Sequence, residues 1–503
     1  MPTSSPNILY ILADDMGYGD VRHLNPDCAF PTPNLDRLGL EGMTFTDAHS
    51  SSAVCTPSRY SILTGRYCWR TFLKSGVIGG TDGPLLGERE TTVADVLKRA
   101  GYRTACIGKW HLGWNWGVKE GHQPNRGDWN GNHQDWIDFS KPVTGGPVDH
   151  GFDSFYGIIG SLDMPPYVFV ENNRPVQDPA AWGTNHEFMR EGPRQGDLRA
   201  HTVLGELTRR AVGFIENQTE EQPFFLYLPL TAPHSPIAPS AEFLGASGVN
   251  PYADFCMEVD SRVGEVLAAL ERTGLDQNTL VIFTADNGAA AQFVEAEALE
   301  RHYNHFCSYC YRGYKSDIWD GGHRVPFLVR WPARVEAGTT CDQPVGIFDL
   351  LPTAAELSGQ ELAANEGVDA VSLVKAFCGG DIPPDEREIL VHHSIKGRFA
   401  IRHGNWKMCR CPGSGGWTFP DEKAREEGLA EVQLYNVARD PAEKANLAAE
   451  NPQMVTDLTQ RLHRAILRGR STPGPAQPVP DQLDHWEQID WRAELPVRFL
   501  VDD

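Results

Sequence analysis

The sequence lacks the signatures of several large enzyme classes. It contains no Walker A loop, no G-x-G-x-x-G fingerprint, no H-E-x-x-H motif and no G-x-S-x-G motif. Nothing therefore points to a P-loop nucleotide hydrolase, a dinucleotide-binding oxidoreductase, a zinc protease or a serine hydrolase with a nucleophile elbow.

Positive charge is also scarce. The 503 residues include 45 Lys and Arg against 67 Asp and Glu, a formal net charge of -22. A surface of this sign repels phosphates, so we expect neither nucleic acid nor a membrane as a partner. Salt confines such repulsion to about 8 Å. A local cationic pocket can therefore still bind a small anionic substrate.

Long hydrophobic runs are missing as well. No apolar stretch is long enough to span a membrane, and the N-terminus has neither a basic region nor the long apolar segment of a secretory signal. The eleven cysteines are an odd number in a large chain, which favours reduced thiols. We therefore expect a cytoplasmic protein.

Short apolar runs alternate with helical patterns over the first two thirds of the chain. Strands are expected at 7–13, 102–107, 223–230 and 279–285, and helices at 34–42, 92–100, 201–218, 252–272 and 347–358. This alternation predicts a large α/β domain over residues 1–380, with a mainly parallel central sheet flanked by helices.

The pattern changes near Asp381. Strands with hairpin-type spacing are expected at 389–394, 398–408 and 432–437, followed by a helix at 452–467. We expect a smaller C-terminal α+β subdomain with an antiparallel sheet over residues 381–470.

The tail, residues 471–503, carries large apolar side chains. They are Trp486, Trp491, Phe499 and Leu500. Because such groups are seldom left in water, we expect the tail to pack on the body or on a second subunit, as in a homo-oligomer. Disorder of the tail is the alternative.

Oxygen-bearing side chains follow two of the expected buried strands. Asp14 and Asp15 end the first strand, and Asp286 and Asn287 end the strand at 279–285. Either group alone is more typical of a turn or a helix cap. Together, at the carboxyl ends of strands where α/β proteins bind ligands, they favour a hard cation such as Ca²⁺ or Mg²⁺.

A second motif surrounds Cys55. The segment reads Cys55-Thr-Pro-Ser-Arg59 and continues to Leu63-Thr-Gly65. Pro57 favours the first turn of a helix, which would place Cys55 at a helix N-terminus that attracts anions. Arg59 would lie one turn further on the same face. A single cysteine is more often an inert buried thiol.

The Cys-x-Pro-Ser-Arg motif with its Leu-Thr-Gly resembles the signature of the type I sulfatases, arylsulfatase-like members of the alkaline phosphatase superfamily. Further marks of that family occur in the same order between residues 7 and 447. They are Asn7–Asp15, Gly108–Gly113, Pro233-His234, Thr284–Gly288, Lys315 before Trp319–Gly322, and a pattern over 434–447. Such ordered co-occurrence is far more specific than any single motif.

The resemblance implies an alkaline phosphatase-like fold and hydrolysis of a small-molecule sulfate ester. In this family a formylglycine-generating enzyme converts the cysteine, here Cys55, into 3-oxoalanine (formylglycine). One hydroxyl of its hydrate attacks sulfur, and loss of the proton from the other expels sulfate. One divalent cation is implied, Ca²⁺ first and Mg²⁺ or Mn²⁺ as alternatives. Its ligands would be Asp14, Asp15, Asp286, Asn287 and residue 55.

The resemblance also assigns roles close to the nucleophile. Arg59 would stabilise the ionised nucleophile, Lys109 would hold nucleophile or sulfate oxygens, and His111 would accept the proton when the aldehyde re-forms. Lys109 and His111 are two residues apart on an expected extended segment, so both side chains should project to one side.

Three further residues would contact the substrate. His234 and Lys315 would reach sulfate and the bridging oxygen, and His234 would protonate the leaving group. Ser161 would touch sulfate, from a loose match over 151–161, where a turn serine is the alternative. His302, His305 and His323 lie nearby without an assigned role. The tryptophans at 114, 116, 129 and 136 would stack on a ring or pack on the body.

Two rival functions remain open. The same site could prefer phosphonate monoesters or phosphodiesters. If Cys55 stays unmodified, the chain could instead be a non-catalytic binding protein on this scaffold.

Overall fold

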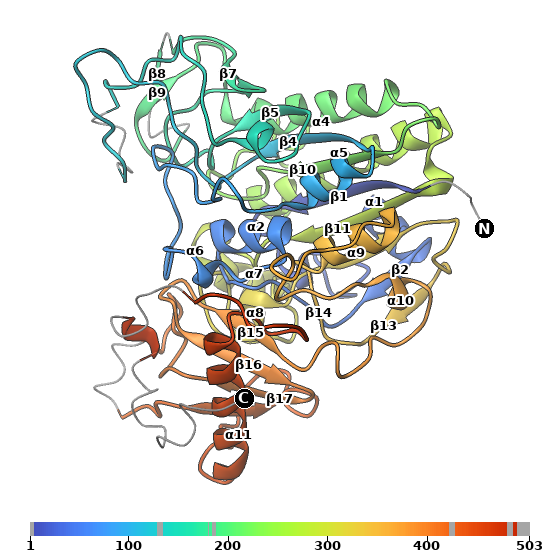
Figure 1. Ribbon diagram of the computed structural model, residues 1–503, viewed down its shortest axis with the longest axis vertical. Helices are drawn as coiled ribbons and strands as arrows, with labels where there is room; N and C mark the ends of the chain where they lie inside the picture. The colour runs from blue at the N-terminus through green and yellow to red at the C-terminus, as the bar shows by residue number, and fades with distance from the viewer. Residues whose placement is uncertain are drawn as a thin grey trace.

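A ten-stranded sheet forms the centre of the molecule (Figure 1). The computed structural model describes residues 5–127, 134–179, 181–183, 188–421, 428–479 and 486–489. The strands of this sheet are β1 (Asn7–Ala13), β2 (Met43–Phe45), β4 (Arg103–Lys109), β5 (Ser154–Ile158), β6 (Val170–Glu171), β7 (Arg174–Pro175), β10 (Phe224–Pro229), β11 (Thr279–Ala285), β12 (Phe327–Arg330) and β13 (Thr339–Cys341). Their order is β13-β2-β12-β11-β1-β10-β4-β5-β6-β7.

The middle of this sheet is parallel. β11, β1, β10, β4 and β5 pair in parallel, whereas β12 and the β5-β6-β7 edge add antiparallel pairs. Every residue of β1, β10 and β11 is buried, which explains their continuous apolar runs, since a parallel strand is covered on both faces. The predicted α/β fold with a mainly parallel sheet is confirmed.

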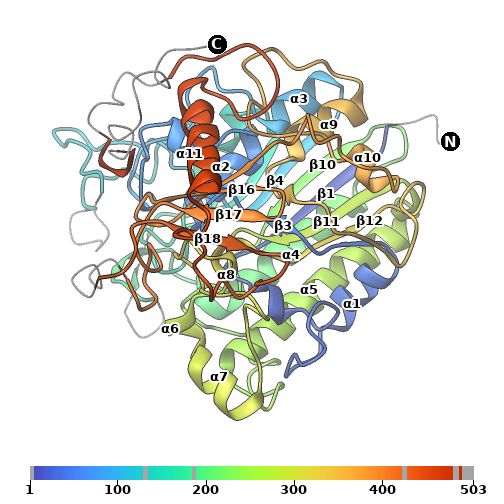
Figure 2. The same cartoon turned by 90° about the horizontal axis from the view of Figure 1, so that it is seen from below.

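Helices cover both faces of the sheet. Their bounds are α1 (Pro33–Leu40), α2 (Cys55–Thr64), α3 (Val93–Arg99), α4 (Ala200–Glu216), α5 (Pro251–Thr273), α6 (Ala291–Val294), α7 (Ala296–Tyr303), α8 (Asp320–His323), α9 (Leu350–Ser358) and α10 (Val374–Phe377). Figure 2 shows α1, α4 and α5 on one face and α2, α3 and α9 on the other. Two small ladders complete this part, β3 (Ala48–His49) with β14 (Val345–Gly346) and β8 (Ala181–Gly183) with β9 (Gly192–Arg194).

Local signals in the sequence explain where several helices begin and end. The Thr92 side chain caps α3 and forms a capping box with Asp95. Asn250 caps α5, Pro251 occupies its first turn, and Gly274 ends it at φ 74°, a left-handed conformation that glycine adopts without strain.

The register of the central strands positions the functional site. Ala13, the last residue of β1, lies opposite Ala285, the last residue of β11. The next residues, Asp14 and Asp286, therefore leave the same edge of the sheet side by side, and Asp286 N–H donates to the carbonyl of Ala13 at 3.1 Å.

A separate antiparallel sheet follows near the C-terminus, with a long helix beside it (Figure 1). Its strands are β15 (Leu390–His393), β16 (Phe399–His403), β17 (Trp406–Cys409) and β18 (Gln433–Asn436), and the helix is α11 (Pro452–Leu467). One expectation here was wrong. The single strand expected over 398–408 is a hairpin, because Gly404 turns the chain at φ 55° between β16 and β17.

Buried charges join this sheet to the large domain. Lys407 Nζ lies 2.6 Å from Asp320 Oδ1 and 2.9 Å from Glu443 Oε1, and all three side chains are fully buried. Arg402 forms a second link to Asp47, with 2.6 Å between Nη2 and Oδ2. Because an unpaired buried charge is strongly unfavourable, such pairs restrict the orientation of the C-terminal sheet more than they add stability.

Part of the tail packs on the body. Trp486 is 5% exposed, and its ring lies 6.0 Å from that of Trp69 and 5.4 Å from that of Phe399. Lys74 Nζ lies 4.4 Å from the centre of the same ring. Trp491, Phe499 and Leu500 lie outside the described residues. The domain limits at 380 and 470, and a homo-oligomer through the tail, stay predictions.

The tryptophans of the 113–150 stretch fill the interior. Trp114, Trp116 and Trp136 are each at most 4% exposed, and the first two meet edge to face at 5.2 Å. They therefore pack on the body and leave no free face for a ligand. Trp129 lies outside the described residues.

Two bulk properties complete the description. All eleven cysteines are free thiols. Among the described residues, no helix combines the length and apolarity required to cross a bilayer.

The packing of Trp486 predicts a measurable contribution to stability. Trp486→Ala should lower the free energy of unfolding by about 3 kcal/mol, because it leaves a cavity between Trp69 and Phe399. Urea unfolding followed by tryptophan fluorescence measures the change. Phe72→Ala, at a side chain that is 69% exposed, is the control and should change it by less than about 0.5 kcal/mol. Equal effects of the two substitutions would contradict this packing.

Candidate active site

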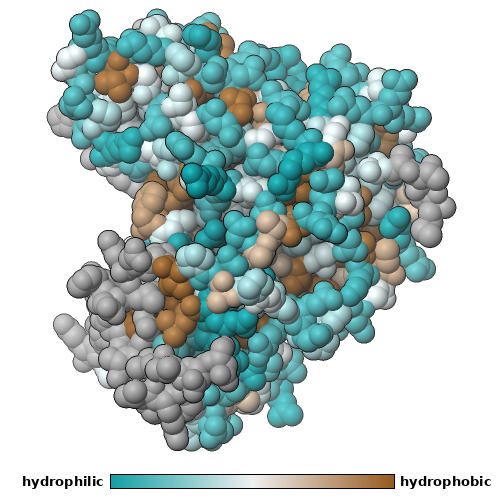
Figure 3. Space-filling view, in the orientation of Figure 1, coloured by the Kyte–Doolittle hydropathy of each residue, from teal (hydrophilic) through white to brown (hydrophobic). Residues whose placement is uncertain are grey.

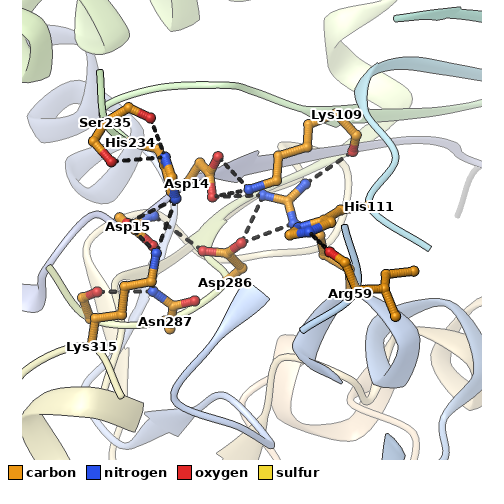
Figure 4. Close-up of polar contacts among 12 residues, drawn as sticks. Asp14, Asp15, Arg59, Lys109, His111, His234, Ser235, Asp286, Asn287 and Lys315 are labelled. Carbon is orange, nitrogen blue, oxygen red and sulfur yellow. Dashed lines mark hydrogen bonds and ion pairs between the residues drawn. The ribbon is translucent and has the colours of Figure 1, made fainter. Parts of the chain in front are cut away.

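Charged side chains from five separate stretches of the chain meet at the carboxyl edge of the central sheet (Figure 4). Asp14 and Asp15 follow β1, Asp286 and Asn287 follow β11, and Lys109 is the last residue of β4. Arg59 comes from α2, and Lys315 from the loop before α8. All of them are buried. The structure thus brings together residues that lie as far apart in the sequence as Asp14 and Lys315.

Three carboxylates in this cluster face three cations. Arg59 donates to Asp286 Oδ2 from Nε at 2.9 Å and from Nη2 at 2.7 Å, and Nη2 also lies 3.2 Å from Asp14 Oδ1. Lys109 Nζ donates to both oxygens of Asp14, at 2.9 and 2.8 Å. Lys315 Nζ donates to Asp15 Oδ2 at 2.6 Å. Burial alone would raise the pKa of Asp14. The positive charges of Lys109, His234 and Arg59 instead hold this pKa well below its usual value.

Left-handed backbone conformations are concentrated at this site. Asp15, His111 and Ser316 have φ values of 64°, 56° and 83°. Residues other than glycine adopt this region at an energetic cost, and such strain is typical of functional sites whose surroundings fix it. Here the backbone N–H of Asp15 donates to Asp286 Oδ1 at 3.1 Å, which holds the two acidic loops together.

Cys55 lies at the N-terminus of α2, as the sequence predicts. It is 2% exposed, and its Sγ belongs to a group with Asp14 and His234 whose ligand atoms all lie within 4.8 Å of one another. Burial would raise the pKa of the thiol, but Lys109, Lys315 and a hydrogen bond with His234 lower it to about 7. The helix N-terminus and the lysines create a site that favours an anion.

His111 is close to the cluster, but not for the reason given by the sequence. The backbone leaves the extended conformation after Lys109 and is left-handed at His111, so simple alternation does not orient these two side chains. His111 Nε2 lies 2.9 Å from the carbonyl of Ile78 and must donate to it. Burial and the charges of Lys109 and Arg59 hold the pKa of His111 well below its usual value. The ring is therefore neutral, and its buried Nδ1 keeps a lone pair without a partner among the described residues.

His234 contacts two charged side chains of the cluster, Lys315 and Asp15. Its Nδ1 donates to the carbonyl of Ser235 at 2.6 Å, and its Nε2 lies 3.0 Å from Lys315 Nζ and 3.5 Å from Asp15 Oδ2. Burial and Lys315 would lower the pKa of His234, but Asp15 and Asp14 raise it to about 9. This imidazole is therefore well suited to hold a proton at neutral pH once an anion draws Lys315 away.

Ser161 and Asp163 lie on the loop after β5. The hydroxyl of Ser161 is buried without a hydrogen-bond partner among the described residues, and its contact with sulfate stays a prediction.

Sequence reasoning missed Asp163. Burial would raise its pKa, but His234, Arg190 and Lys109 lower it, so its carboxylate lies near the cluster. Its Oδ1 is buried and has no partner in the described structure. No motif marks this residue.

The three histidines without an assigned role lie in different environments. His305 Nε2 is 2.8 Å from Asp20 Oδ1, and its side chain is fully buried. His323 Nδ1 lies 3.3 Å from the carbonyl of Ser50 and is buried too. His305 and His323 are therefore both held by contacts inside the protein. His302, on α7, is exposed.

The acidic residues fit a hard divalent cation. Asp14, Asp15 and Asp286 each offer an oxygen, and the three oxygens lie within 4.8 Å of one another. Asn287 Nδ2 donates to Asp15 Oδ1 at 2.7 Å, which leaves Oδ1 of Asn287 buried without a partner among the described residues. An unsatisfied buried carbonyl beside three carboxylates is an all-oxygen set of the kind that Ca²⁺ and Mg²⁺ prefer.

The fold and this cluster define a hydrolase of the alkaline phosphatase-like superfamily. A model of the Sulfatase family matches residues 6–360. The chain belongs to the sulfatase family and is a sulfuric ester hydrolase.

Individual relatives agree with this assignment. The chain is 32% identical to an N-acetylgalactosamine-6-O-sulfatase of Bacteroides thetaiotaomicron, over 93% of this chain and 94% of the relative. It is 28% identical to human N-acetylgalactosamine-6-sulfatase, over 97% of this chain and 89% of the relative. A solved structure from work on glycosaminoglycan metabolism by Bacteroides thetaiotaomicron superposes with a TM-score of 0.78 at 29% identity, covering 92% of this chain and 99% of that one.

The oxygen cluster predicts stabilisation by a divalent cation. Ca²⁺ at 100 times its dissociation constant should add about 2.7 kcal/mol to the free energy of unfolding, and a chelator should remove this gain. Asn287→Ala should reduce the gain, because it removes the unsatisfied carbonyl. Urea unfolding with and without Ca²⁺ measures both effects.

The matched control is Asn25→Ala, at another buried asparagine, whose Nδ2 donates to the carbonyl of Gly19. This variant should lose stability and keep the full response to Ca²⁺. A wild-type protein that does not respond to saturating Ca²⁺ or Mg²⁺ would disprove the metal site.

Proposed function

We propose that the protein hydrolyses sulfate monoesters through a formylglycine made from Cys55. The observation that carries this proposal is the position of Cys55, at a helix N-terminus beside Lys109, Lys315 and His234. The hydrate of an aldehyde there supplies two hydroxyls on one carbon, one to attack sulfur and one whose deprotonation expels sulfate.

A divalent cation, Ca²⁺ in the first place, would be held by the oxygens after β1 and β11 together with residue 55. These ligands are Asp14, Asp15, Asp286, Asn287 and Cys55 in its modified form. The ion would supply Lewis acidity, which favours ionisation of the nucleophile and offsets charge on the sulfate. Mg²⁺ or Mn²⁺ would satisfy the same oxygen donors.

The cations of the site bind the sulfate group and orient it. Lys109 and Lys315 lie on either side of Asp14 and Asp15, and both lower the pKa of the thiol at position 55, so their charges reach the place where sulfate must sit. Arg59 is held by Asp286 and by the carbonyl of Lys109, at 3.0 Å from Nη1. It stabilises negative charge at residue 55 from a fixed position.

Two histidines move protons in opposite directions. His111 is neutral, and its Nδ1 has no partner in the part of the chain that the structure describes. A base needs this state to accept the proton of the second hydroxyl when the aldehyde re-forms. His234 has a raised pKa, about 9. When Lys315 turns to the sulfate, Nε2 of His234 can take up a proton from solvent, and it delivers this proton to the bridging oxygen so that the leaving group departs as the alcohol.

Maturation requires a second protein. Cys55 is 2% exposed in the folded chain, so a formylglycine-generating enzyme must reach it before α2 is buried. A cytoplasmic location remains part of this proposal. The relatives named for N-acetylgalactosamine 6-sulfate make a sulfated sugar a candidate substrate.

Replacement of the nucleophile should remove the activity. Cys55→Ser lacks the second hydroxyl, so turnover of 4-nitrophenyl sulfate should fall to the background while the unfolding transition is retained. Mass spectrometry of the peptide over residue 55 should show an aldehyde in the wild-type protein. Cys310→Ser, at an exposed thiol, is the control and should keep full activity.

Two results would contradict the proposal. An unmodified Cys55 in the native host, without esterase activity, would favour a binding protein. A preference of orders of magnitude for aryl phosphonate esters over aryl sulfates would assign the site to phosphonate hydrolysis.

The role of His234 predicts a dependence on the leaving group. His234→Ala should lower kcat/KM about 100-fold on alkyl sulfates, whose alkoxide leaving groups need a proton, and less than about 10-fold on 4-nitrophenyl sulfate. His201→Ala, at an exposed histidine of α4, should leave both values unchanged. An equal loss on the two substrates would show that His234 is not the proton donor.

A further inference from the structure

A cavity of about 470 Å³ opens beside Lys315. Its lining comes from α6, from α7, from the segment that carries Lys315, and from a loop after β17. The lining residues are Ala291, Gln292, Ala296, Glu297, Glu300, Tyr314, Lys315, Trp417 and Thr418. Figure 3 shows the surface indented at its left edge, beside the position of α6 in Figure 1. Since Lys315 also reaches the acidic cluster, this cavity adjoins the site proposed for sulfate.

The loop that carries Trp417 is fixed to the residues that follow Lys315. The backbone N–H of Trp417 donates to Ser316 Oγ at 3.0 Å and to Asp317 Oδ1 at 3.1 Å, and that of Thr418 donates to Asp317 Oδ1 at 3.1 Å. Gly416 permits this approach, because a Cβ there would lie 2.5 Å from Asp317 Oδ1. The position of Trp417 is therefore coupled to that of Lys315.

Three side chains in this cavity are available to a ligand. Trp417 is 46% exposed, in a protein that buries most of its tryptophans. Gln292 and Glu297 are exposed, and neither has a hydrogen-bond or ion-pair partner among the described residues. An aromatic side chain in the same cavity as an amide and a carboxylate matches the chemistry of a sugar ring, whose C–H face packs on an indole while its hydroxyls donate to oxygen acceptors.

We propose that this cavity binds the alcohol part of the substrate, and that this part is an uncharged pyranose stacked on Trp417. The proposal rests on the proposed function, because it assigns the leaving group of the same reaction. The sulfate would lie at Lys315, and the sugar would extend from it between Trp417 and α7. A volume of 470 Å³ exceeds the needs of sulfate and lies in the usual range of small-molecule sites, about 300–1,000 Å³.

The charges around the cavity select against a second anion. Lys315 lies 2.6 Å from Asp15 in this structure and would face the sulfate when a substrate binds, so its charge is not available to a second anion. Glu300 accepts a hydrogen bond from the Tyr314 hydroxyl. Glu297 adds a negative charge without a counter-ion in the described structure. A uronic acid or a second sulfate next to the reacting ester would meet these two glutamates, and repulsion of this kind provides specificity.

Substitution of Trp417 tests the stacking. The probes are 4-nitrophenyl sulfate, galactose 6-sulfate, and inorganic sulfate as a competitive inhibitor. Trp417→Ala should lower kcat/KM for galactose 6-sulfate at least about 10-fold, whereas the inhibition constant of sulfate should change less than about twofold. Trp417→Phe should retain most of the activity, since it keeps an aromatic face.

The matched control is Trp182→Ala, at a tryptophan of β8 that is 49% exposed and does not line the cavity. It should leave galactose 6-sulfate turnover unchanged. If Trp417→Ala also leaves it unchanged while the wild-type protein hydrolyses 4-nitrophenyl sulfate, the sugar site is wrong and the proposed function stands. If the wild-type protein hydrolyses no sulfate ester and carries an unmodified Cys55, the proposed function itself fails.

Substitution of Glu297 tests the charge selectivity. Wild-type protein should prefer a neutral sulfated hexose over the same sugar linked to a uronic acid. Glu297→Gln should raise kcat/KM for the uronate-bearing probe about threefold at low ionic strength and leave that for the neutral probe within twofold. A wild-type preference for the uronate-bearing probe, or an unchanged ratio in the variant, would overturn the assignment of an uncharged sugar.

Discussion

The balance of charge at the carboxyl edge of the sheet is the constraint on which the site depends. Asp14, Asp15 and Asp286 are buried together, and an isolated buried carboxylate would cost several kcal/mol. Arg59, Lys109 and Lys315 compensate them at hydrogen-bond distance. Under the proposed function the same cations would also bind the sulfate group. A divalent ion held by the carboxylates would supply positive charge in place of the lysines, so that the lysines could bind the substrate.

The central sheet supplies the rigidity that this balance requires. β1 and β11 end in register, and all residues of both strands are buried. The acidic loops that follow therefore start from fixed points, and the hydrogen bond between Asp15 N–H and Asp286 holds them together. The left-handed backbone at Asp15 is tolerable only in such surroundings. Strain and charge repulsion in the site are thus offset by the packing of a wholly buried sheet.

The sequence predicts those parts of the molecule that depend on local patterns. Buried strands at 7–13 and 279–285, the helix that begins at Cys55, and oxygen ligands at two strand ends all follow from apolar runs and their boundaries. Contacts between distant segments cannot be read from such local patterns. The orientation of His111 and the proximity of Asp163 to His234 arise from tertiary packing. The turn at Gly404 is a local signal, and the single strand expected over 398–408 overlooked it. Trp417 carries no motif, and its hydrogen bonds to Ser316 and Asp317 connect it to the segment of Lys315.

The two ends of a sulfate ester are met by parts of the protein with different freedom to change. The sulfate end faces strand termini and α2, whose residues are wholly buried and constrained by the charge balance, so that most substitutions there disturb the whole cluster. In the proposed binding mode the alcohol end faces α6, α7 and a loop from the C-terminal sheet. Exposed residues there, such as Gln292 and Glu297, have no hydrogen-bond or ion-pair partner among the described residues and are free to change. Asp317 joins the two ends, because it fixes the Trp417 loop from a position two residues after Lys315. Substrate choice can therefore vary within this fold without alteration of the chemistry at residue 55.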